Sequence, residues 1–130
     1  MVINYQKIYE KLGYLFYAVA SADKVVTTAE VERLKEMIQK LWLPAEPSTD
    51  EFGTDAAHYI WISFDYLMNE GVDADIAFDE FRRYYLEHKD HFPDEMRKNI
   101  KMTCREIAGA FRGPSKRELE TLQDVEDLLQ

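Results

Sequence analysis

Two acidic residues, Asp23 and Glu30, stand seven positions apart across a segment predicted to be a turn. Carboxylate, carbonyl and water oxygens are the ligands that hard divalent cations prefer. Against the loop of an EF-hand, Asp23 falls at the fifth position and Glu30 at the twelfth. Val19 and Ser21 occupy the first and third positions, and Lys24 replaces the glycine of the sixth, so a complete EF-hand is excluded. A partial, weak site for Ca²⁺ or Mg²⁺ remains, which a third acid from elsewhere in the fold would strengthen.

The same two acids also have a purely structural interpretation. The segment Thr27-Thr28-Ala29-Glu30 has the spacing of a capping box, in which the Thr27 side chain accepts from the Glu30 amide and the Glu30 side chain accepts from the Thr27 amide. Asp23 can stabilise the turn or the end of the preceding helix. From the residues alone, capping and cation binding both stay open.

Other residue types with chemical potential give weaker patterns. His88 and His91 stand three apart beside Glu87 and Asp90, a group that could hold a transition metal. A histidine at a helix C-terminus more often complements the helix dipole. Cys104 lies on an apolar helical stripe and is expected to be a buried thiol. No Ser/His/Asp or Cys/His arrangement and no glycine-rich phosphate loop can be identified. These observations favour a protein that is not an enzyme.

Helical periodicity runs through nearly the whole chain. The expected helices cover about 4–22, 28–42, a third from Thr54 or Asp55 to Gly71, a fourth from Asp73, a fifth from Pro93 to Gly113-Pro114, and a sixth from Ser115. Residues 43–53 contain two prolines and a glycine and are expected to form a loop. No segment alternates like a strand, so the prediction is one all-α domain over residues 1–130, a bundle of about six helices.

The chain contains an internal repeat. Residues 19–34 align without a gap with residues 107–122. Each copy has a helix end rich in small residues, a turn, a capping box and an apolar helix, which predicts two paired helical hairpins. The copies differ where the first has Asp23 and the second has Phe111.

The net charge of −9 is unfavourable for a nucleic-acid-binding protein, which needs a basic surface. Residues 97–117 nevertheless hold seven basic residues and one acid. Arg97, Lys101 and Arg105 are spaced by four and would share one helical face. That face is either a solvated surface or a docking patch for an acidic protein partner or for a second copy of the chain.

Further patterns concern the cellular location. The most apolar window, residues 12–22, is about half as long as the roughly 20 residues that a membrane span needs. The N-terminus shows no basic segment before an apolar core, and a single cysteine excludes an internal disulfide framework. We therefore expect a cytoplasmic protein that does not insert directly into a membrane.

The run from Ala18 to Leu34 resembles the signature of the tellurite-resistance TerB-like family. That signature has small residues, an Ala-Asp-Gly, a hydrophobic residue, a Ser or Thr, and a Glu that opens the next helix. Asp23, Thr27 and Glu30 match it, whereas Lys24 replaces the usual glycine. The family's second pattern is similar to residues 107–118, although Phe111 lacks the acid.

The resemblance implies a helical bundle built from paired repeats, whose acidic residues bind a divalent cation. Residue by residue, it implies Asp23 and Glu30 as ligands of a first site and Glu118 as the remnant of a second. It further implies a non-enzymatic cytoplasmic module that acts in stress response, including tellurite resistance, together with membrane-associated protein partners. The alternative is a metal-free interaction module that docks through the basic 97–117 face.

Overall fold

The computed structural model describes residues 3–45 and 55–130, and in these ranges the chain is all-α. The longer helices are α1 (Tyr5–Ala20), α2 (Thr28–Met37), α4 (Tyr59–Glu70), α5 (Ala74–Glu87), α6 (Asp94–Ala108) and α7 (Lys116–Leu128). Short helical turns complete the described chain: η1 (Ile38–Trp42), α3 (Leu43–Ala45), η2 (Ala56–His58) and η3 (Lys89–His91). The predicted bundle of about six helices is confirmed.

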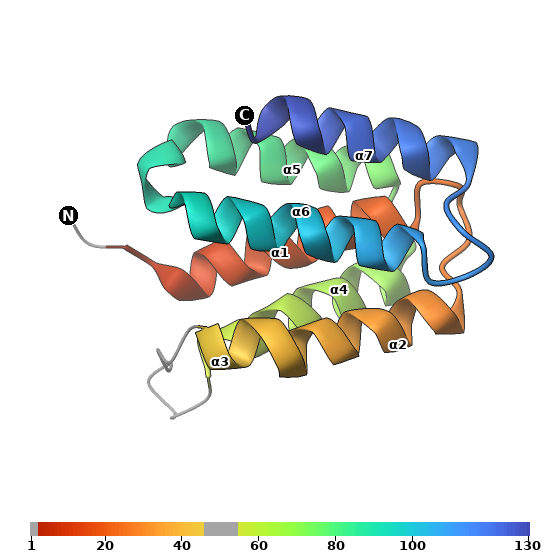
Figure 1. Ribbon diagram of the computed structural model, residues 1–130, viewed down its shortest axis with the longest axis horizontal. Helices are drawn as coiled ribbons and strands as arrows, with labels where there is room; N and C mark the ends of the chain where they lie inside the picture. The colour runs from red at the N-terminus through yellow and green to blue at the C-terminus, as the bar shows by residue number, and fades with distance from the viewer. Residues whose placement is uncertain (1–2, 46–54) are drawn as a thin grey trace.

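Helix α1 lies at the centre of the bundle and packs against α4, α5, α6 and α7 (Figure 1). Its second half is apolar on every side, and the side chains from Leu15 to Ala20 are all buried. At Gly13, an added Cβ would lie 2.6 Å from the carbonyl oxygen of Ile60, so glycine permits this close approach of α1 and α4. Helix α1 has 16 residues, and no helix in the described part of the chain is long and apolar enough to cross a membrane.

The helix ends follow the capping residues in the sequence. Asn4, Thr27, Asp73 and Ser115 are N-caps whose side chains accept a hydrogen bond from the first turn, as expected. Pro93 is itself the N-cap of α6 instead of a first-turn residue. Thr54 lies outside the described residues, and Asp55 precedes η2 without a side-chain cap.

The expected loop at residues 43–53 is wrong at its start. Leu43–Ala45 continues the helical path, and residues 46–53 lie outside the described part of the chain. The helix expected over 28–42 changes to π-helical hydrogen bonding at Ile38–Trp42. The buried Trp42 at the end of this turn donates from Nε1 to the Thr103 hydroxyl at 3.0 Å, which fixes its ring against α6.

The loop from α1 to α2 and the loop from α6 to α7 lie at the same end of the molecule, beside one another (Figure 1). They hold the two copies of the internal repeat. The fold therefore brings together two segments that are far apart in the sequence, and Glu30 of the first copy and Glu118 of the second line one pocket there.

Candidate cation site

The two loops share an unusual backbone conformation at equivalent positions. Lys24 has φ = 70° and Arg112, its counterpart in the repeat, has φ = 57°. This left-handed region costs a residue with a Cβ roughly 1 kcal/mol or more. Lys24 thus adopts a conformation that suits glycine, the residue expected at that position from the resemblance. The repeat is a repeat of structure and not only of helix-start residues.

Each loop ends in a complete capping box. Glu30 Oε1 accepts from the Thr27 amide at 2.8 Å and from the Thr27 hydroxyl at 3.0 Å. In the second copy, Glu118 Oε1 accepts from the Ser115 amide at 2.9 Å. Ordinary capping boxes lie on the surface, but both of these glutamates are only 3% exposed. Capping alone does not explain the burial of two carboxyl groups.

The two buried glutamates line the same pocket, close enough for Glu118 to act on the Glu30 carboxyl group. Glu118 Oε2 is buried and receives no hydrogen bond from an N–H or hydroxyl donor of the described residues. Burial, together with the neighbouring Glu118, raises the pKa of Glu30 to about 8. Two full negative charges side by side are unfavourable, so Glu30 keeps its proton near neutral pH.

Asp23 lies at the rim of the same site. It lines a pocket of about 220 Å³ with Glu30, Glu118 and the loop residues 111–115. The Asp23 side chain is exposed, and its Oδ1 accepts from the Val25 amide at 3.1 Å. Among residues 3–45 and 55–130, no group of three or more His, Cys, Asp or Glu side chains is arranged to hold a metal ion. The structure thus pairs Glu30 with Glu118 and leaves Asp23 apart.

The donor set of the pair fits a hard cation in its chemistry. Both glutamates already use Oε1 in their capping boxes, which fixes the side chains and leaves both Oε2 atoms available. A divalent cation in place of the Glu30 proton would satisfy the buried Glu118 Oε2. Arg112 also lines the pocket, and its positive charge would repel a cation there. Its guanidinium lies over the Phe111 ring, 5.2 Å from the centroid.

Three basic residues of α6 have ion-pair partners within the molecule, and two of them share one carboxylate. Lys101 Nζ lies 3.3 Å from Glu126 Oε2, and Arg105 Nη1 lies 3.1 Å from Glu126 Oε1. Arg97 pairs with Asp94 one turn earlier. These three cations therefore help to hold α7 on α6 or stabilise the start of α6, which leaves less charge for an acidic partner.

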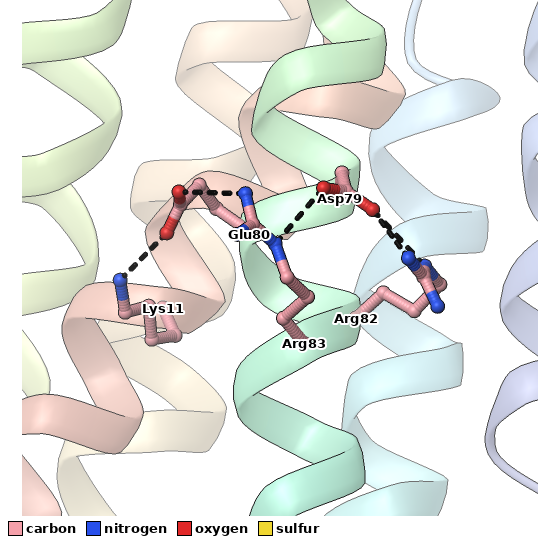
Figure 2. Close-up of polar contacts among 5 residues, drawn as sticks. All are labelled: Lys11, Asp79, Glu80, Arg82 and Arg83. Carbon is pink, nitrogen blue, oxygen red and sulfur yellow. Dashed lines mark hydrogen bonds and ion pairs between the residues drawn. The ribbon is translucent and has the colours of Figure 1, made fainter.

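Helix α5 shows the same tendency to pair its surface charges (Figure 2). Glu80 bridges Lys11 of α1 at 3.2 Å and Arg83 at 3.3 Å, and Asp79 bridges Arg82 and Arg83. Exposed ion pairs of this kind contribute little to stability, typically below about 1 kcal/mol each. The network fixes side chains on the outer face of α5 and offers no open group of acids for a metal.

His88, His91 and Cys104 do not line the pocket of the glutamate pair. His88 Nδ1 lies 2.9 Å from the Tyr84 carbonyl oxygen, and its ring stacks on that of Tyr84 at 4.1 Å, as suits a residue at the end of α5. The centroid of the His91 ring is 5.4 Å from that of His88. Cys104 is fully buried, as expected, and burial raises the pKa of its thiol, which makes it unreactive.

The contact between Glu30 and Glu118 was not predicted from the sequence, although a signal was present. The repeat alignment places these two residues in register, and a pseudo-symmetric packing of the hairpins would bring equivalent residues together. No family model, curated protein or solved structure matches this chain.

Proposed function

We propose that this protein is a TerB-like module that binds a divalent cation between the two halves of its internal repeat. The observation that carries the proposal is the buried pair Glu30 and Glu118, held by matching capping boxes on adjacent loops. A fold that only needed helix caps would leave both carboxylates in water. Burying them costs stability unless a proton or a cation is held between them.

Glu30 and Glu118 would hold the cation through their Oε2 atoms, and Asp23 at the rim would contribute through water. When bound, the cation would supply a positive charge that links the start of α2 to the start of α7. Two carboxylates are few ligands for Ca²⁺, which takes six to eight oxygens, so we expect weak binding at roughly millimolar concentration.

In this proposal the protein is non-enzymatic. The site offers carboxyl groups and hydroxyl caps but no nucleophile with an adjacent base, whereas the two repeats offer a junction that a cation can tighten. The protein would act in the cytoplasm as a regulatory or scaffold component of a stress response of the tellurite-resistance type. Cation binding would set the rigidity of the two loops toward a protein partner, including a membrane-associated one.

The proposal is tested by thermal unfolding at pH 7 with Ca²⁺, Mg²⁺ or Mn²⁺. A cation at ten times its Kd stabilises the folded state by about 1.4 kcal/mol, which raises Tm by roughly 3–6 °C in a domain of this size. The double variant Glu30→Gln with Glu118→Gln should lose this rise while keeping both capping acceptors. Asp23→Asn should reduce it only in part.

The controls separate binding from screening of the net charge. Sodium chloride at matched ionic strength measures screening, and Glu120→Gln with Asp124→Asn removes two exposed acids of α7 away from the site. A rise in Tm that is equal in the wild type and in the Glu30/Glu118 variant would refute the proposal.

We propose as an alternative that an acidic protein docks on the basic 97–117 face. The ion pairs to Glu126 and Asp94 reduce the number of basic side chains on this face that are free for a partner. Reversal of Lys101 and Arg105 would disturb the contact between α6 and α7, so it cannot test docking cleanly. Arg112, Lys116 and Arg117 are exposed, and their reversal to Glu leaves those ion pairs intact. Unchanged capture of a partner by that triple variant would count against docking.

A further inference from the structure

A second pocket lies at the opposite end of α1 from the glutamate pair. It has a volume of about 330 Å³ and lies between the start of α1, the η1 turn and the start of α6. Tyr9 and Trp42 line it, and they are only 1% and 2% exposed. Asp90 and Glu95, which also line it, are exposed. The pocket therefore has an aromatic floor and an acidic mouth.

The aromatic floor is built by packing that fixes the rings. The Tyr9 and Trp42 rings meet edge to face, with centroids 6.0 Å apart and planes at 77°. The Trp42 indole is held by its hydrogen bond to Thr103. Tyr5, half-buried, adds a third aromatic residue to the lining. Rings that are already fixed offer an apolar contact to a ligand without having to reorganise.

The charges at this pocket favour a cationic ligand. Asp90 and Glu95 are acidic, and no lysine or arginine in the described part of the chain lines the pocket. The net charge of −9 adds a general attraction for cations. An anionic ligand would be repelled, and a neutral apolar one would gain nothing from the two carboxylates.

One polar atom of the lining is left without a partner. His91 Nδ1 is buried and makes no hydrogen bond with the described residues. A neutral imidazole with its proton on Nε2 presents Nδ1 as an acceptor. A primary ammonium group can donate to this atom, whereas a quaternary ammonium cannot. An unpaired buried polar atom is costly, so a donor from a ligand would remove that cost.

The geometry points to a binding site for a small primary ammonium compound with an apolar arm. The arm packs against Tyr9 and Trp42, and the ammonium group donates to His91 Nδ1 near the carboxylates of Asp90 and Glu95. The site shares no residue with the pocket of the glutamate pair, so ammonium binding can be tested independently of the proposed cation binding.

The test is an NMR titration of the ¹⁵N-labelled protein with 2-phenylethylammonium, and with 2-phenylethanol as its uncharged analogue. We expect saturable shifts of the Trp42 indole and the His91 ring with the amine, and at least about tenfold weaker binding of the alcohol. Choline, which is cationic but has no N–H group, should bind more weakly than the amine.

Variants then assign the contributions. Asp90→Asn with Glu95→Gln, at two exposed positions, should weaken binding of the amine about tenfold or more, as should His91→Phe. The matched control Glu120→Gln with Asp124→Asn makes the same change in net charge on α7 and should leave binding unchanged. Equal affinities for amine and alcohol, equal losses in the pocket and control variants, or no shift of Trp42 would overturn the inference.

Discussion

The loop from α1 to α2 and the loop from α6 to α7 are two versions of one structure. Both contain a residue in the left-handed conformation, Lys24 and Arg112, and both end in a capping box. Both bury the glutamate of that box. They differ one residue earlier, where the first loop has the exposed acid Asp23 and the second has the exposed aromatic Phe111.

Features that both loops share are needed for the loop structure, and features found in one loop alone are not. The turn, the cap and the buried glutamate are common to both copies, so they belong to the packing of each hairpin and to the junction between them. Asp23 is not needed for the frame, because the second copy forms without an acid at that place. Asp23 Oδ1 accepts from the Val25 amide within its own loop, and the buried glutamates are the acids that both copies have in common.

We expect the loss of one buried glutamate to destabilise the fold more than any change in the turns. Glu30→Ala and Glu118→Ala should each lower the free energy of unfolding by about 2 kcal/mol, because each loses the acceptor of a capping box and leaves a gap at the junction. Urea unfolding at pH 6 measures this. A large loss in one variant and none in the other would show that the two loops are not equivalent.

The next effect concerns pH and follows from the raised pKa of Glu30. In the unfolded chain this carboxyl group has its ordinary pKa of 4.5, and in the folded protein its pKa is about 8. The folded state then binds more protons between these values, so its stability falls as the pH rises. The stabilisation that protonated Glu30 gives to the folded state is fully present below pH 4.5 and is lost as the pH rises through 8.

We expect the free energy of unfolding to fall by about 2 kcal/mol between pH 5 and pH 8 on account of this pair. Glu30→Gln keeps a hydrogen-bond donor toward Glu118 and carries no titratable proton, so this variant should show a flatter profile and greater stability at pH 8. Parallel profiles for the variant and the wild type would place the proton elsewhere. Urea unfolding at five pH values is sufficient.

Glycine in place of the left-handed residue of each turn should have a small effect on stability. Lys24→Gly and Arg112→Gly should each relieve left-handed strain, and the gain is partly offset by the greater freedom of glycine in the unfolded chain. We expect a net stabilisation of about 0.5 kcal/mol for each. Thermal unfolding of both variants measures it, and a loss of stability in either would mean that its side chain makes a contact the turn depends on.

Much of the fold could be predicted from local sequence rules. Capping residues such as Thr27 and Ser115 fix where helices begin, and Gly71 ends α4 in the left-handed conformation, because these effects act over a few residues. The change to a π-helix at Ile38–Trp42 could not be predicted. Trp42 at its end donates to Thr103, a partner that is distant in sequence.

The site was predictable residue by residue but not in its grouping. The sequence identifies Asp23, Glu30 and Glu118 as acids in a repeated frame. Which two of them meet is decided by how two hairpins pack, and the spacing within one loop does not contain that information. The ion pairs of Lys101 and Arg105 with Glu126 are a similar case, since α7 must be placed before they can be seen.

In the proposed module, a divalent cation replaces the proton that Glu30 holds beside Glu118. The direct measurement is isothermal titration calorimetry with Ca²⁺, Mg²⁺ and Mn²⁺ at pH 7, repeated in two buffers of different ionisation enthalpy, which counts the protons released. We predict saturable binding with close to one proton released per cation, and no release at pH 9. Flat traces with all three cations, or binding at pH 7 without proton release, would contradict the claim.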